Sequence, residues 1–280
     1  MYDARSNKSS SGGNVGFALI AIGVIAAVFI AVLLMPSSNG KAGGPKALAA
    51  SVDTSSQTLE AVFEGRAAKT YLAALGKVDP GAVNELERRV QKRRASDVPI
   101  LILNEHISDV MAAHADTLAQ ANAKHLDGML VLTRDRLRDA SRSRSKWCEG
   151  SHYAAMTEMS EPEMMAFVEE MTTLNEPVQD FILRMNTLML EAILDARENP
   201  VRHGALNASD EAAMQGLVMS MVSDPQVMPL IMQAQAGASP ESVLAKLNIC
   251  ELGATAMLAI KTLPQDTKGR VWAEAIRNSG

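Results

Sequence analysis

Aromatic residues are scarce in this chain of 280 residues, where five Phe, three Tyr and two Trp amount to 4%. β-Strands draw on aromatic and β-branched residues, so the shortage argues against a β-sandwich or a β-barrel. The helix formers Ala, Leu, Met, Glu and Arg are plentiful instead. The composition therefore predicts an all-α protein.

The sequence motifs of the common enzyme classes are missing as well. The chain contains no P-loop, no G-x-G-x-x-G, no G-x-S-x-G and no H-E-x-x-H. Glu149 and His152 form a single E-x-x-H, whereas a di-iron bundle needs two. His106 and Asp109 lie three residues apart on a predicted helix, and we interpret them as a surface pair. We predict no catalytic residue and no cofactor.

One enzyme interpretation remains as an alternative. Glu241-Ser242, on a predicted helix, resembles the Glu-Ser pair of lytic transglycosylases over these two residues alone. In such an enzyme a carboxylic acid acts as the general acid that cleaves a glycan. Glu241 also has an ordinary explanation, because a carboxylate in the first turn of a helix is favoured by the helix dipole. The alternative function is thus a membrane-tethered, glycan-cleaving envelope enzyme.

Residues 15–35 form an uncharged run, V-G-F-A-L-I-A-I-G-V-I-A-A-V-F-I-A-V-L-L-M. A helix of this length spans about 30 Å, the thickness of a bilayer core. The apolar core of a cleaved signal peptide is shorter, about 7–15 residues, and is closely followed by a cleavage site. We therefore predict an uncleaved transmembrane helix at 15–35, preceded by a short cytoplasmic tail at 1–14.

Small residues recur along one side of this predicted membrane helix. Gly23, Ala27 and Ala31 are spaced four residues apart. Such a ladder lets a second helix approach closely in the bilayer. We identify these three residues as a candidate contact for a homodimer.

A flexible linker and a helical domain are predicted to follow. Residues 36–56 are rich in Ser, Gly, Ala and Pro and lack an apolar period, which is typical of a tether. In residues 57–280, Asp or Ser precedes Pro at 79–80, 224–225 and 239–240, which marks helix starts. The predicted helices of this bundle-like domain are 57–77, 80–95, 99–143 with a break near Gly128, 150–158, 161–174, 177–198, 209–222, 225–236, 240–262 and 267–277.

The two halves of this domain carry opposite charge. Residues 66–146 contain 15 Lys and Arg against 10 Asp and Glu, whereas residues 147–280 contain 8 against 18. Either the halves pack together, or the basic half contacts anionic lipid headgroups. Residues 134–146 hold six cations but no aromatic side chain for stacking on bases, so we predict no nucleic-acid partner.

The chain has only two cysteines, Cys148 and Cys250. A disulfide between them would close a loop of about 100 residues and stabilise the fold by about 4–5 kcal/mol in the chain-entropy model. Such a bond persists in an oxidising compartment, and an N-terminal anchor is a natural way to place the following domain there. The alternative is two unrelated buried thiols, since free Cys packs as a small hydrophobic residue.

Soft metal ligands lie next to the first cysteine. If Cys148 starts a helix, His152, Met156 and Met159 share its face, and His and Met can hold Cu(I). However, Met readily fills helical cores, and no dense His/Met cluster is present. We predict no metal site, and we interpret Glu149-Gly150 as a turn between the basic helix and the acidic half.

These observations lead to one function prediction. We expect a single-pass protein of the plasma (inner) membrane with a helical extracytoplasmic domain. That domain would bind other envelope proteins, or a second copy of itself, as a scaffolding module. The second alternative inverts the topology and gives a cytosolic domain that binds lipid or nucleic acid.

Overall fold

The computed structural model describes residues 59–63, 65–93, 99–154, 160, 163, 176–223 and 227–279. Within these ranges the protein is all-α, as predicted, and its single β feature is an isolated bridge between Glu149 and Asn248. The elements are α2 (Leu59–Val62), α3 (Arg66–Val78), α4 (Pro80–Gln91), α5 (Pro99–Ala113), α6 (Ala115–Leu118), α7 (Ala123–Arg142), the 3₁₀ helix η1 (Lys146–Cys148), α8 (Gly150–Ala154), α10 (Glu176–Glu198), α11 (Ala208–Val222), α12 (Met228–Gln235), α13 (Pro240–Leu244), α14 (Ile249–Lys261) and α15 (Gln265–Ser279).

The predicted tail, membrane helix and linker lie outside the described residues, and so do the candidate dimer contacts Gly23, Ala27 and Ala31. Met156 and Met159 also lie outside them. Among the helices that the structure describes, none is both long enough and apolar enough to cross a bilayer. The membrane anchor therefore stays a prediction from the sequence.

The Pro-preceding caps that fall on described residues are confirmed. The Asp79 carboxylate accepts hydrogen bonds from the backbone N–H groups of Gly81 and Ala82, at 2.9 and 3.1 Å, and Pro80 opens α4. The Ser239 hydroxyl accepts from the N–H of Ser242 at the start of α13. These side chains satisfy backbone donors that the first turn of a helix leaves unpaired.

The long helix predicted at 99–143 is wrong in its continuity. The chain bends at His114 and again between α6 and α7, where Asn122 caps the new helix through the N–H of Lys124. Gly128, where we placed the break, lies inside α7. The second bend therefore has a local cause, because Asn is a preferred N-cap residue, whereas His114 makes no side-chain cap at the first bend.

Two further predicted helices are interrupted. The first, at 57–77, breaks at Gly65, whose φ of 97° is accessible to glycine at little cost. The second, at 240–262, splits into α13 and α14 at Asn248, whose side chain accepts from the N–H of Glu251 at 3.1 Å. This second break places Cys250 in the first turn of α14.

Helix α7 separates two hydrophobic cores. The main core lies among α2–α6, α10 and α15, and it includes Leu190 and Ile193, which are fully buried. The second core, here called the disulfide core, consists of Leu130, Leu137, Cys148, Met221, Cys250, Ala254, Ala256 and Met257. Met129 of α7 belongs to the main core, while Leu126 packs against both. Because neighbouring positions of α7 face different cores, this helix joins the two parts of the domain.

Close packing of α14 against α7 depends on small residues. A Cβ atom on Gly253 would lie 2.9 Å from the Cδ1 atom of Leu137, closer than carbon atoms normally approach. Ala254 and Ala256, both buried, add little bulk to the same helix. In the charge pattern, α7 belongs to the basic half and α14 to the acidic half, so the halves pack together, as the first of the two interpretations expected.

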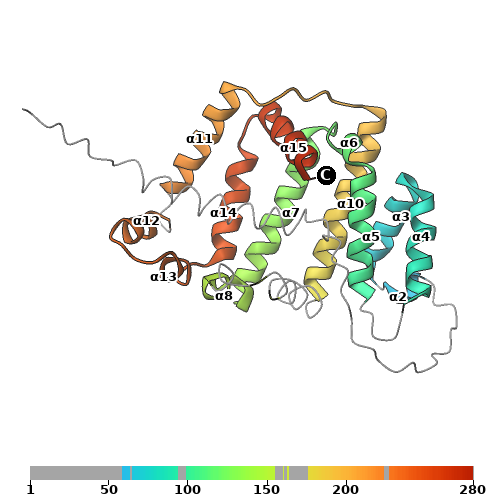
Figure 1. Cartoon of the computed structure of the whole chain (residues 1–280), viewed down its shortest axis with the longest axis horizontal. Helices are drawn as coiled ribbons and strands as arrows, with labels where there is room; N and C mark the ends of the chain where they lie inside the picture. The colour runs from blue at the N-terminus through green and yellow to red at the C-terminus, as the bar shows by residue number, and fades with distance from the viewer. Residues whose placement is uncertain are drawn as a thin grey trace, which may run out of the picture.

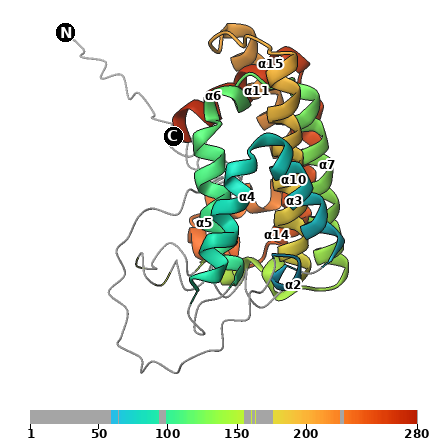
Figure 2. The ribbon, with the colours of Figure 1, turned by 90° about the vertical axis from the view of Figure 1, so that its right-hand side faces the viewer.

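The two ends of the bundle are distinct. Figure 1 shows α2 and α8 at its lower end, and α6 with the connection from α10 to α11 at its upper end. Figure 2, turned by 90°, shows α3, α5, α7 and α10 running between these ends. On the left in Figure 1, α11, α12 and α13 lie beyond α14, away from α3 and α4.

We predict that Ile193→Ala destabilises the domain by about 2–5 kcal/mol, because it removes fully buried methyl groups and leaves a cavity in the main core. Urea unfolding of the full chain in detergent micelles, followed by far-UV circular dichroism, measures the loss. The matched control is Glu191→Ala, an exposed change on the same helix, which should shift stability by less than about 0.5 kcal/mol. Equal effects of the two variants would contradict the packing described for α10.

Candidate protein-interaction surface

Helices α11, α12 and α13 form an arm (residues 208–244) on the side of α14 that faces away from the main core (Figure 1). α11 contacts α14, and α13 contacts α8, while the path between them passes through α12. The chain enters the arm after α10 and returns to the bundle at α14. The contacts at these two attachment points therefore determine how rigidly the arm is held against the bundle.

The first attachment point is the buried carboxylate of Asp210. Its oxygens accept two hydrogen bonds from the guanidinium of Arg270 at 2.7 and 2.8 Å, and one from the hydroxyl of Thr267 at 2.7 Å. The backbone N–H of Asn207 donates to the same carboxylate at 3.0 Å, and the Asn207 side chain caps α11 in return. We call this set the Asp210 clamp. It ties the start of α11 to α15 by a bidentate, charge-assisted contact, which is the strong kind.

The charge on the clamp is stabilised by its surroundings. Hydrogen bonds from Arg270 lower the pKa of Asp210 well below its ordinary value, and the Thr267 hydroxyl and the Asn207 N–H act in the same direction. The Asp210 side chain is fully buried, so an unpaired charge at this position would be expensive. All of its acceptor capacity is used within the fold. The Asp210 carboxylate is therefore fully engaged in structural contacts.

The second attachment point lies where the arm returns. The N–H of Gly150 donates to the carbonyl of Leu247 at 2.9 Å, and Glu149 pairs with Asn248 in the isolated β-bridge. A side chain on residue 150 would overlap the backbone of Leu244, so only glycine allows this close approach. The corner that we predicted at Glu149-Gly150 is confirmed, and its glycine is required by contact with the arm.

Cys148 and Cys250 meet at the same point. Their Cα atoms are 5.0 Å apart and their sulfur atoms lie at disulfide distance, so the structure brings together the pair that the sequence singled out. Cys148 ends η1, and Glu149 is extended, so Cys148 does not start a helix that continues through His152. The shared helical face that a metal site would need is thus absent at its first residue.

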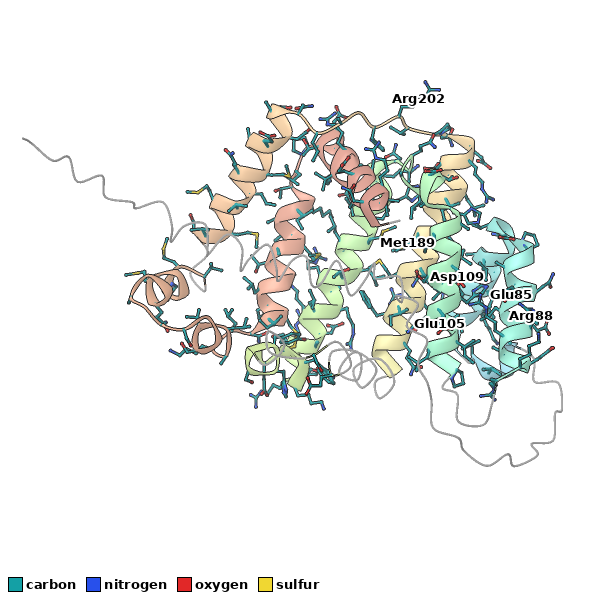
Figure 3. The ribbon with its side chains drawn as sticks, in the orientation of Figure 1. Glu85, Arg88, Glu105, Asp109, Met189 and Arg202 are labelled. Carbon is teal, nitrogen blue, oxygen red and sulfur yellow. A yellow bond between two sulfur atoms is a disulfide. The ribbon has the colours of Figure 1, made fainter. Side chains whose placement is uncertain are left out.

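Apolar side chains of the arm are turned toward solvent. Of the 15 residues of α11, only Asp210 and Met221 are buried, although most of the helix is apolar. The side chain of Met219 is 63% exposed, that of Met228 41% and that of Met232 63%. Figure 3 shows sulfur atoms projecting from α11 and α12. Exposed clusters of large apolar side chains are typical of interaction sites, and flexible Met side chains adapt to varied partners.

The arm also has a one-sided charge. The sequence between Gly204 and Ala245 contains no Lys and no Arg, and its carboxylates are Asp210, Glu211, Asp224 and Glu241. Asp210 is buried in the clamp, whereas Glu211 is exposed in the first turn of α11. A complementary partner surface would combine apolar side chains with cations.

Glu149 and His152 are the candidate metal ligands of this segment that remain among the described residues. Among the described residues no group of three or more His, Cys, Asp and Glu side chains could hold a metal ion. Glu149 and His152 pair with each other, with the Nε2 and Oε2 atoms 3.9 Å apart. The His152 ring also lies 6.1 Å from the ring of Trp147, centroid to centroid. These contacts with each other and with Trp147 give Glu149 and His152 a structural role at the turn around Glu149-Gly150.

The predicted surface pair of His106 and Asp109 is wrong. His106 is buried, and burial lowers the pKa of its imidazole, while the Ala82 backbone hydrogen-bonds to the ring and opposes that shift. Asp109 binds the guanidinium of Arg89 at 2.7 Å, and Arg89 also holds Glu85. Figure 3 labels Glu85, Arg88, Glu105 and Asp109 on α4 and α5. His106 and Asp109 do lie three residues apart on a helix, as predicted, but α4 covers His106, so the two do not form a surface pair.

The Glu-Ser pair of the glycan-cleavage alternative lies on a short helix of the arm. Glu241 lies in α13, a helix of five residues, and its side chain is not among those described. The hydroxyl of Ser242 donates to the carbonyl of Ser239 at 2.8 Å, an ordinary bond within a helical turn.

Sequence reasoning missed the Asp210 clamp, although Asn207 and Asp210 have the spacing of a capping box.

Comparisons with protein-family models, with curated proteins and with solved structures give no match for this chain.

We predict that the attachment of α11 weakens in acid. Since the pKa of Asp210 is lower in the folded protein than the ordinary value of about 4, its stabilising effect is complete above that value. The effect is lost progressively as the pH falls from about 4 toward the lowered pKa of the folded state, where the carboxylate of the folded protein becomes protonated. The protection factors of residues 208–222 against hydrogen–deuterium exchange, which are corrected for the intrinsic effect of pH, should fall in Asp210→Asn at pH 7, and acid should then lower them less than in the wild type.

Glu211→Gln is the control for this prediction, because it removes the same charge from the next, exposed residue. It should leave the exchange of α11 nearly unchanged at pH 7. Equal acceleration by the two variants would show that the clamp does not hold the arm.

Proposed function

We propose that this protein is a single-pass, membrane-anchored protein of the cell envelope. Its helical extracytoplasmic domain acts as an interaction module, and the arm binds a partner protein. The observation that carries the proposal is the exposure of Met219, Met228 and Met232 on helices whose attachment points are built from buried polar and covalent contacts. A surface that served only to cover the core would bury these side chains.

The chemistry of the arm indicates the kind of partner. Its apolar side chains favour a partner helix or face with apolar side chains of its own. Its carboxylates, with no cation between Gly204 and Ala245, favour Lys or Arg at the border of that face. A second copy of the chain lacks cations on its own arm, so an arm-to-arm homodimer is disfavoured and another envelope protein is the proposed partner.

The location rests on two features. The uncharged run at 15–35 has the length of a membrane-spanning helix. The pairing of Cys148 with Cys250 is of the kind that persists outside the cytoplasm. The proposed topology places residues 1–14 in the cytoplasm and the described domain beyond the plasma membrane. Gly23, Ala27 and Ala31 remain the proposed contact if the anchor pairs with a second copy.

We predict that both cysteines are linked in the native protein. Cells that express the full chain are lysed in a denaturant that contains N-ethylmaleimide, so that buried thiols also react, and the purified protein is analysed by mass spectrometry. Neither Cys148 nor Cys250 should carry the label, and both should carry it when the protein is reduced first. Cys148→Ser provides the control, because it should expose Cys250 to labelling without reduction. Two labelled cysteines in the unreduced wild type would overturn the proposed compartment.

We also predict that the arm contacts the partner directly. A photo-crosslinking amino acid at Met219 or Met232 should give the same crosslinked species in intact membranes, and mass spectrometry should identify its second component. Replacing both Met residues by Gln should lower recovery of that component by about tenfold or more, because burying a Met side chain contributes roughly 1.5–3 kcal/mol.

Leu258 supplies the matched control for the arm. It is an exposed apolar residue, 43% accessible, but it lies on α14 outside the arm. A crosslinker at this position, or Leu258→Gln, should give neither the species nor the loss. Crosslinking of equal strength from all three positions would mean that the arm has no special role.

A further inference from the structure

A cluster of cations lies at the end of α7, where the proposed function makes no use of it. Arg138 and Arg142 are four residues apart near the end of that helix, and Arg144, Lys146 and Trp147 follow in the turn and in η1. We call these five residues the basic corner. Arg142, Arg144 and Lys146 are exposed. The pairing of Cys148 with Cys250 holds the end of this segment against α14.

The positive charge of the arginines in the corner is only partly compensated. From Arg138 to Arg144 the sequence contains three Arg residues and one carboxylate, Asp139. Arg142 pairs with Asp139 at 3.5 Å, and both side chains are largely exposed, so the pair contributes little. For Arg138 and Arg144, no carboxylate among the described residues lies within ion-pair distance. The three arginines therefore carry net positive charge at this end of α7.

Trp147 adds an amphipathic ring to these cations. The Lys146 ammonium lies 4.5 Å from the centre of the Trp147 ring, and the Trp147 carbonyl accepts the hydroxyl of Tyr153 at 2.7 Å. Trp and Tyr together with Lys and Arg are the residues enriched where a bilayer meets water. A nucleic-acid surface would instead need several aromatic side chains interleaved with the cations.

The placement of the corner connects it to the membrane. α8, which directly follows the corner, lies at the same end of the bundle as α2, the first described helix (Figure 1). Met35 ends the predicted membrane helix 24 residues before Leu59. A flexible linker of that length has a typical end-to-end distance of about 30 Å. On the proposed anchor, the end of the bundle that carries the basic corner is therefore the end from which the chain leads to the bilayer.

We infer that the basic corner docks the domain onto the anionic phospholipid surface of the bilayer that holds the anchor. Guanidinium groups of Arg138, Arg142 and Arg144 would donate to lipid phosphates, and Trp147 would enter the headgroup layer. This inference rests on the proposed anchor but not on the proposed partner of the arm. Docking would fix the orientation of the domain, since an anchor and a linker alone leave it free to turn.

The test uses the full chain in lipid nanodiscs that contain brominated lipids, which quench nearby tryptophan. Discs of phosphatidylglycerol with phosphatidylcholine should quench Trp147 at least about twofold more than discs of phosphatidylcholine alone, and high salt should abolish the difference. The signal of Trp147 is obtained by subtracting that of Trp147→Phe. The second tryptophan, Trp272, is buried beside α6 and should stay unquenched.

A matched pair of double variants isolates the charge. Arg142→Gln with Arg144→Gln should lower the docking equilibrium by about 25-fold, since each cation near an anionic surface contributes about fivefold. The control is Arg277→Gln with Arg202→Gln. Arg277 forms an exposed i,i+3 pair with Glu274 that resembles the pair of Arg142 with Asp139. Arg202 is exposed at the opposite end of the bundle (Figure 3).

The outcomes separate the inference from the proposed anchor. A chain that does not enter the discs refutes the anchor. A chain that enters them but shows equal quenching in both lipids, or equal loss in both double variants, refutes the docking. Binding of a single-stranded oligonucleotide that depends on Arg142 and Arg144, without quenching by lipid, would also refute it and would assign the corner to nucleic acid.

Discussion

The contact between α7 and α14 is the constraint on which the rest of the structure depends. α7 carries main-core residues on one face and disulfide-core residues on another. The second face is buried only because α14 packs against it. α14 does so at close range because Gly253 leaves space for Leu137. Both attachments of the arm are built around this pair of helices. α15, which carries Arg270, follows α14 and packs on α7, and Cys250 opens α14 itself.

Much of the fold could be predicted from local chemistry. Asp79 followed by Pro80 contains all the information needed for a helix start, because the cap involves neighbouring backbone groups alone. Pairing of the cysteines followed from there being only two. The bend at Asn122 has a similar local signal, since Asn caps α7, but our prediction of a continuous helix did not use it. The bend at His114 has no side-chain cap, so no local contact of this kind indicates it.

The parts that define the candidate site were less visible in the sequence. Asp210 and Arg270 are 60 residues apart, and no local pattern indicates that they meet. His106 has the spacing of a surface residue, yet α4 covers it, and only the tertiary arrangement places α4 there. The exposure of α11 could not be predicted for a different reason. Most of its residues are apolar, as in a buried helix, and only the tertiary arrangement leaves it open to solvent.

The pairing of the cysteines has a consequence for the integrity of the chain. Cys148 and Cys250 are 102 residues apart, and the whole arm lies between them. With the two sulfur atoms linked, a protease that cuts once within the arm separates no fragment, because the pieces on either side of the cut remain joined at α14. The exposed helices that are most accessible to digestion are thus enclosed in a covalent ring, and the terminal helices stay fastened to the N-terminal part of the chain.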